Sequence, residues 1–178
     1  MAVNNKVIEL TGTVRTVAGR KILEFDENSS LQLPSRGQVA VDVLGPTGAV
    51  TAVLEPDGRK GHWVAIDGSG PLVIEAADGD SLQLQVETGA AWPEATVPAD
   101  LAQALEAAPE LDETWQSLTP MARWEWVRWV GATSNPATRN RRVEVSISKL
   151  RDGKRRPCCF DLSSCTDPEL AKSGKLIS

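Results

Sequence analysis

The chain has 178 residues, of which 41% are hydrophobic and 24% are charged, and its formal net charge is −5 at pH 7. This size fits one domain or two small ones, and the composition suffices for a hydrophobic core. No apolar run approaches the roughly 18 residues of a membrane-spanning helix, and the net negative charge disfavours attraction of the whole molecule to nucleic acid.

The first half of the chain predicts β-strands with one buried face. Apolar and polar residues alternate over residues 8–15, 38–43 and 82–87, and alternation with period two is typical of a strand. Turn-forming pairs such as Asp67-Gly68 separate the runs. Six or seven short strands with this spacing suit a closed β-barrel or a sandwich. A closed barrel over residues 5–93 is favoured, because closure removes the exposed edges of a small sheet.

His62 is the candidate ligand residue of this barrel, with Arg59 and Lys60 beside it. Alternation places His62 on the same strand face as Val64 and Ile66. A single histidine on an apolar face is most often a hydrogen-bonded core residue. The functional alternative is a polar anchor for a ligand in the barrel mouth, where Arg59 and Lys60 would add positive charge.

The pattern becomes helical after Pro93, and a small helical unit is predicted over residues 97–153. Thr119-Pro120 and Asn135-Pro136 are N-cap and first-turn pairs, and Asp152-Gly153 is a stop signal. Residues 143–147 also alternate as a strand would, but the start signal and the apolar spacing over residues 143–150 favour a helix. The predicted fold class is therefore α+β, a barrel followed by helices.

Three tryptophans belong to the third predicted helix, which starts at Pro120. Trp124 shares a three-residue spacing with Met121 and Val127 and is assigned to the core, and Trp126 and Trp129 are expected to pack on a neighbouring element. The alternative is that these rings stack on the bases of a nucleic acid beside the arginines.

Positive charge is concentrated in residues 123–156, which hold ten Arg/Lys and three Asp/Glu, whereas residues 1–122 hold seven Arg/Lys and eighteen Asp/Glu. The helix starting at Asn135 is the sharpest candidate site, because a helix N-terminus exposes N–H groups and a positive dipole end. Thr138, Arg139 and Arg142 would bind a small anion or an acidic peptide at the barrel–helix junction. Alternatively, these arginines pair with the chain's own carboxylates, or the basic helix binds nucleic acid.

The segment 154–178 is predicted as a tail that contains all three cysteines, Cys158, Cys159 and Cys165. With His62 they would complete a four-ligand zinc set, although the spacing matches no zinc pattern. Thiol redox chemistry and inert reduced thiols are the alternatives. An odd number of cysteines, and an N-terminus without an apolar signal core, favour a reducing, cytoplasmic location.

A non-enzymatic binding protein is favoured over an enzyme. The chain has a single histidine, so a Ser-His-Asp or Cys-His mechanism would have to be built on His62. Neither a phosphate-binding glycine loop nor a nucleophile elbow occurs, and no motif identifies a cofactor.

The order of barrel, tryptophan-rich helix and the element Thr138-Arg139-x-Arg141-Arg142-Val143 resembles the bacteriocin-protection family called YdeI/OmpD-associated. The resemblance covers roughly residues 7–159. It implies a barrel of unknown function followed by a helical region. The family's name implies protection from antibacterial peptides, and it supplies no catalytic residue.

Overall fold

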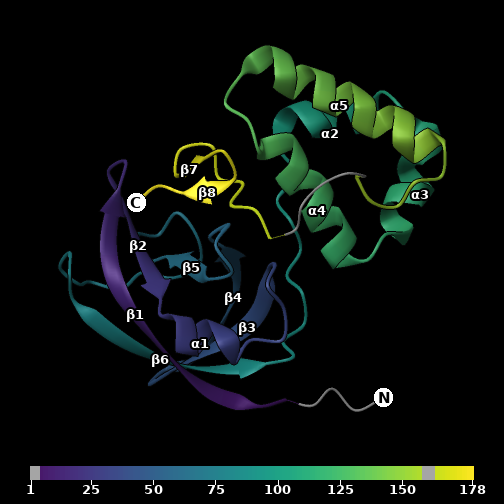
Figure 1. Cartoon of the computed structure of the whole chain (residues 1–178). Helices are drawn as coiled ribbons and strands as arrows, with labels where there is room; N and C mark the ends of the chain where they lie inside the picture. Colours follow the sequence, from purple (N-terminus) through teal and green to yellow (C-terminus); the bar gives the residue numbers. More distant parts are fainter. Residues whose placement is uncertain (1–4, 158–162) are drawn as a thin grey trace. The chain divides into compact units, whose positions relative to one another are not determined.

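The computed structural model describes residues 5–157 and 163–178, and these residues form two compact units (Figure 1). The barrel unit holds the described residues up to Trp92 together with residues 163–165 and Leu170–Ser178. The helical unit holds residues 93–157 together with Thr166–Glu169. None of the helices in the described part of the chain is long and apolar enough to cross a bilayer.

Six antiparallel strands close into the predicted barrel, in the order β1-β2-β5-β4-β3-β6, with β6 pairing back onto β1 (Figure 1). The strands are β1 (Val7–Val17), β2 (Arg20–Phe25), β3 (Val39–Gly45), β4 (Gly48–Pro56), β5 (His62–Ala65) and β6 (Ser81–Thr88). The alternation in the sequence is confirmed, because Ile8, Leu10 and Val14 are buried in the barrel core. An α+β fold with an N-terminal barrel is therefore confirmed.

Gly12 lies where β1 changes partner along its length. Residues Gly12–Val17 pair with β2, and Val7–Thr13 pair with β6. A Cβ atom at Gly12 would lie 2.8 Å from the carbonyl oxygen of Glu24 and 3.0 Å from the side chain of Leu23. Glycine at this position therefore permits the close approach of β1 and β2 that closes the barrel.

A short helix, α1 (Glu27–Leu31), follows β2 and was not predicted from the sequence. Asp26 caps it by accepting a hydrogen bond of 2.7 Å from the backbone N–H of Ser29. The Ser29 hydroxyl in turn accepts a bond of 2.7 Å from the N–H of Thr11 on β1. Five residues are too few to show helical periodicity, so only the cap was a visible signal.

The C-terminal residues 170–178, here called the C-terminal strap, pack on the barrel. They contain a hairpin of β7 (Ala171–Lys172) and β8 (Lys175–Leu176). Leu170 and Leu176 are fully buried in a cluster with Val17, Ile22 and Trp63. The predicted tail is thus, over these residues, part of the barrel unit's core.

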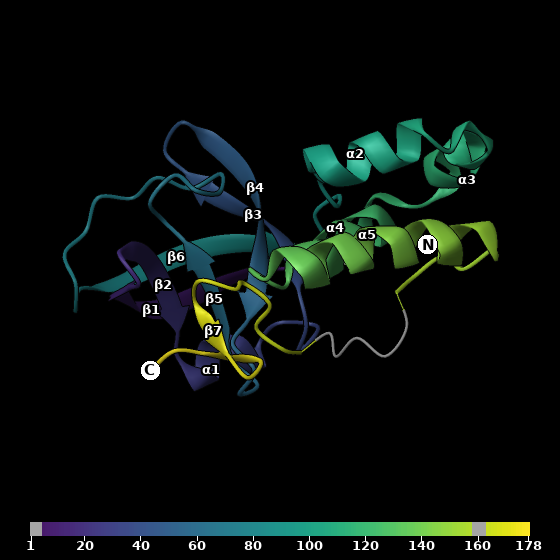
Figure 2. The ribbon, with the colours of Figure 1, turned by 90° about the horizontal axis from the view of Figure 1, so that it is seen from above.

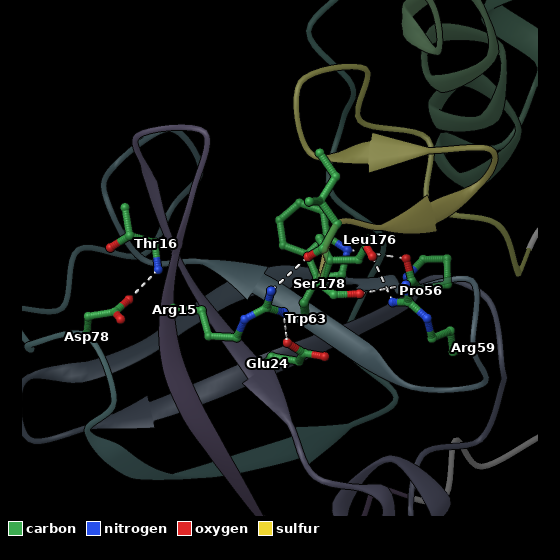
Figure 3. A network of polar contacts seen from close by, with 10 residues as sticks. Arg15, Thr16, Glu24, Pro56, Arg59, Trp63, Asp78, Leu176 and Ser178 are labelled. Atoms are coloured by element: carbon green, nitrogen blue, oxygen red, sulfur yellow. Dashed lines mark hydrogen bonds and ion pairs between the residues drawn. The ribbon is translucent and has the colours of Figure 1, made fainter.

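Two arginines hold backbone carbonyls of the strap (Figure 3). Arg15 forms an ion pair with Glu24 and donates a hydrogen bond of 2.7 Å to the carbonyl of Ile177. Arg59 donates a bond of 2.7 Å to the carbonyl of Leu176 and one of 3.3 Å to the hydroxyl of Ser178. The strap is therefore fixed by polar contacts at its edge as well as by burial of its leucines.

The helical unit contains α2 (Ala99–Glu106), a 3-10 turn at Pro109–Leu111, α3 (Asp112–Ser117), α4 (Pro120–Gly131) and α5 (Pro136–Arg151). Both predicted start signals are confirmed. The Thr119 hydroxyl accepts from the N–H of Ala122, and the Asn135 carboxamide accepts from the N–H of Thr138. Residues 143–147 are helical, as favoured from their spacing, and α5 packs against both α2 and α4 (Figures 1 and 2).

The buried face of α4 differs from the prediction. Ala122, Trp126 and Val130, spaced by four residues, enter the core of the helical unit, and Trp126 is fully buried. Trp124, which was assigned to the core, is half-buried and lies outside this cluster. A tryptophan at every second or third position made two helix faces equally apolar, and packing against α5 selected one of them.

Candidate functional site

Arg139 is paired with a carboxylate of its own unit. Its Nε and Nη2 atoms lie 2.6 Å and 3.1 Å from the two carboxylate oxygens of Asp100. This bidentate bond lowers the pKa of Asp100 below its usual range and raises the pKa of Arg139 further above its own. Arg139 thus joins the first turn of α5 to the first turn of α2. For this residue, the alternative in which the arginines pair with the chain's own carboxylates holds.

Thr138 lies beside Arg139 in the first turn of α5, and its side chain is exposed. Its backbone N–H donates a hydrogen bond of 3.1 Å to the side-chain oxygen of Asn135. One of the unpaired donors that make a helix N-terminus attractive to anions is therefore satisfied by the cap.

Arg142 is placed differently from Arg139. Its Nη1 atom donates a hydrogen bond of 2.9 Å to the backbone carbonyl of Trp129 at the end of α4. Its guanidinium carbon lies 5.4 Å from the centroid of the Trp129 ring. Within the described ranges, Arg142 has no carboxylate partner, so none of the carboxylates described there neutralises its positive charge.

Lys149 brings a second cation to the same ring. Its ammonium nitrogen lies 5.7 Å from the centroid of Trp129. Lys149 follows Arg142 by seven residues, two turns along α5, so both side chains project from one helix face. Ser146 lies between them and is fully buried. Its hydroxyl donates a hydrogen bond of 2.7 Å to the carbonyl of Arg142.

Trp129 is held in place by its neighbour on α4. Its ring lies 6.4 Å from that of the buried Trp126, in a T-shaped arrangement with an interplanar angle of 79°. Such edge-to-face contacts fix ring orientation. Trp129 therefore presents a fixed, electron-rich surface to the two cations of α5. We call Trp129, Arg142 and Lys149 the Trp129 cluster.

Other basic residues of the predicted patch have carboxylate partners. Arg123 pairs with Glu94 at 2.6 Å, and Arg151 pairs with Glu110 at 2.7 Å. These ion pairs join the acidic segment of the chain to its basic segment, as the alternative interpretation of the sequence expected. Arg142 is held against the ring of Trp129 instead.

Glu125 on α4 is a buried charge that the sequence did not single out. Its side chain is almost fully buried, and Arg156 lies 3.3 Å from it. Burial raises the pKa of Glu125, and the positive charges of Arg156 and Arg128 oppose that rise. The one available signal was a glutamate between two tryptophans, and it does not distinguish a buried position from an exposed one.

The three barrel candidates do not form one site. His62 is fully buried, and its Nε2 atom lies 2.9 Å from the carbonyl of Gly37. Arg59 is engaged with the C-terminal strap. Lys60 is exposed, with a backbone φ of 73°. Asp57 organises this turn by accepting hydrogen bonds from the N–H groups of Arg59 and Gly61 at 2.6 Å and 2.8 Å.

Two of the three candidate metal ligands, Cys158 and Cys159, lie outside the described residues. The side chain of Cys165 is buried and packs with Leu170 and Leu176. Across residues 5–157 and 163–178, no group of three or more His, Cys, Asp or Glu residues could hold a metal ion.

The helical unit is also the part of the chain that similarity to known proteins reaches. Residues 94–153 match the family model described as Bacteriocin-protection, YdeI or OmpD-Associated. The match spans α2 to α5, so the resemblance suggested by residues 138–143 is confirmed for this unit. No curated protein and no solved structure gives a significant match. The family description names no ligand, so only the chemistry of the helical unit's own residues can indicate one.

Proposed function

We propose that the YdeI/OmpD-associated unit is a non-enzymatic binding module that holds a small anionic ligand at the Trp129 cluster. One observation carries this proposal, namely that Arg142 and Lys149 lie 5.4 Å and 5.7 Å from the same ring of Trp129. Two positive groups near one ring gather positive charge at this place, and that charge attracts an anion. The ring face attracts both cations and gives the ligand an apolar wall.

Arg139 has a supporting part in this proposal. Its bidentate bond to Asp100 fixes the start of α5 relative to α2, and this anchors the helix that carries both cations. Arg142 keeps guanidinium donors beyond the one that bonds to the Trp129 carbonyl. A phosphate or carboxylate oxygen is the acceptor that those donors suit best.

Isothermal titration with pyrophosphate, ATP and an acidic hexapeptide at low salt tests the proposal. We expect Arg142→Ala and Lys149→Ala each to weaken the tightest of these interactions about tenfold, the scale of a charge-assisted hydrogen bond. Arg141→Ala is the matched control, because Arg141 is the exposed neighbour of Arg142 on the same helix. Circular dichroism of each variant shows whether α4 and α5 stay folded.

Wild-type affinity in both Arg142→Ala and Lys149→Ala, or no binding of any probe at low salt, would contradict the proposal. Tight binding of an oligonucleotide with a steep salt dependence would instead favour the nucleic-acid alternative.

The family description adds a cellular expectation, protection from bacteriocins, which belongs to the same proposal. In a bacteriocin-sensitive strain, expression of the wild-type chain should raise the inhibitory bacteriocin concentration, and the Arg142→Ala/Lys149→Ala double variant should not. A reducing, cytoplasmic location is proposed on the odd number of cysteines in the chain, which does not suit a disulfide framework.

A further inference from the structure

The helical unit also carries a face of opposite charge to the Trp129 cluster. Residues 93–118, which form α2, the 3-10 turn and α3, contain six Asp/Glu and no Lys/Arg. Three of these carboxylates are paired with arginines of α4 and α5: Glu94 with Arg123, Asp100 with Arg139, and Glu110 with Arg151. Glu106, Asp112 and Glu113 take part in no ion pair within the described part of the chain, and of these Glu106 and Asp112 line a hollow.

These two carboxylates stand at the rim of a hollow between α2 and α3. The hollow has a volume of about 240 Å³ and is lined by Val97, Ala102, Leu105, Glu106, Asp112 and Trp115. Its lining is thus apolar apart from Glu106 and Asp112, both of which are exposed. We call it the α2–α3 groove.

The size of the α2–α3 groove limits what it can hold. Pockets for small molecules enclose roughly 300–1,000 Å³, and this groove is smaller. It therefore fits a single large apolar side chain better than a whole ligand. The half-buried Val97 and Leu105, and the largely buried Trp115, supply apolar contacts for such a side chain.

The negative charge at the rim determines which residues can flank the inserted apolar side chain. A segment entering the groove passes Glu106 and Asp112, so residues flanking its apolar side chain meet negative charge. Lysine or arginine at those flanking positions would be attracted, and aspartate or glutamate would be repelled. Glu94, Asp100 and Glu110 already have arginine partners and do not compete for these cations.

We propose that the α2–α3 groove is a docking site for a cationic peptide segment that inserts one large apolar side chain between α2 and α3. This binding is separate from the anion binding proposed above, because it uses different helices and the opposite sign of charge. A protein partner with a basic, apolar-centred segment is the occupant that the groove fits.

The experiment uses the full chain and the pentapeptide Lys-Lys-Leu-Lys-Lys carrying a neutral dye, followed by fluorescence anisotropy at low salt. Replacing the leucine by alanine should weaken binding at least about tenfold, because the apolar anchor is lost. Replacing the four lysines by glutamates should abolish binding. On the protein, Glu106→Gln/Asp112→Asn should weaken binding about fivefold, as expected for two exposed charge contacts.

Two further variants separate the groove from general attraction to an acidic protein. Glu113→Gln/Glu144→Gln removes the same charge at exposed positions that do not line the groove, and it should leave binding unchanged. Ala102→Leu fills the groove and keeps its carboxylates, and it should weaken binding as much as the loss of the peptide's leucine does.

Three results would overturn the proposal. The first is no measurable binding of the lysine peptide, and the second is equal binding by the groove variants and the charge-matched control. The third is concentration-dependent self-association in sedimentation that Ala102→Leu abolishes, because a second copy of the chain would then occupy the groove. None of these depends on Arg142 or Lys149, so failure here is distinct from failure of the anion site.

Discussion

His62 is fully buried in the barrel unit, and this burial couples its charge to stability. Because the Gly37 carbonyl can only accept, Nε2 carries a proton, and neutral His62 leaves Nδ1 without a hydrogen-bond partner. Burial lowers the pKa of His62 below the usual 6.5, and the Arg36 charge acts in the same direction. The Gly37 and Ser35 backbone and the Asp57 carboxylate oppose this shift without reversing it.

The lowered pKa predicts how stability depends on pH. Between the folded pKa and about 6.5, the unfolded chain binds more protons than the folded one, so stability falls as pH falls through this window. We expect the free energy of unfolding to decrease from pH 7 to pH 5 in the wild type. His62→Gln, which cannot titrate, should lose most of this dependence. His62 is the chain's one histidine, so equal slopes in urea titrations of the two proteins would contradict its role.

The C-terminal strap contributes core side chains to a barrel whose strands end much earlier in the chain. Leu176 is fully buried against Trp63 and Ile22. Its backbone N–H donates a hydrogen bond of 2.9 Å to the carbonyl of Asp57. Gly58 permits this approach, because a Cβ atom at that position would collide with the backbone of Gly174. Loss of the strap therefore exposes part of the barrel's own core.

Leu176→Ala should destabilise the barrel unit by about 2–5 kcal/mol, the range for deleting a buried leucine side chain. Ile177→Ala is the matched control, because the neighbouring Ile177 is 39% exposed, and it should change stability by less than about 1 kcal/mol. Chemical denaturation followed by tryptophan fluorescence measures both. A Leu176→Ala variant that unfolds at the wild-type midpoint would show that the strap does not stabilise the barrel.

Each of the two units has a hydrophobic core of its own, as expected for separate folding domains. Leu10 is fully buried in the barrel core, and Leu101 is fully buried in the helical core. These leucines form a matched pair for testing whether the units unfold separately.

Leu10→Ala should accelerate hydrogen exchange in peptides from residues 5–92 and leave residues 99–151 unchanged, and Leu101→Ala should do the reverse. Each substitution should cost its own unit about 2–5 kcal/mol. Mass spectrometry of the exchanged peptides reads both units in one sample. Acceleration of exchange throughout the chain by either variant would show a single cooperative unit instead.

The basic segment illustrates how much of the candidate site the sequence could predict. Composition showed that residues 123–156 are basic and that a capped helix begins at Asn135, and both hold in the structure. It could not assign a partner to each arginine, because Arg139 and Arg142 differ only in their position on the helix. Their positions on α5 send Arg139 to Asp100 and Arg142 to Trp129.

The sequence by itself determined the elements and the fold class, because strand alternation and helix caps depend on residues that are close in the chain. The barrel strands around Leu10 and Val41, and the helix starts at Thr119 and Asn135, are of this local kind. Contacts between distant residues were decided only by tertiary structure. Trp126 rather than Trp124 entered the core, the C-terminal strap joined the barrel, and Glu106 and Asp112 met at a groove, because packing selects among faces that a sequence pattern leaves equivalent.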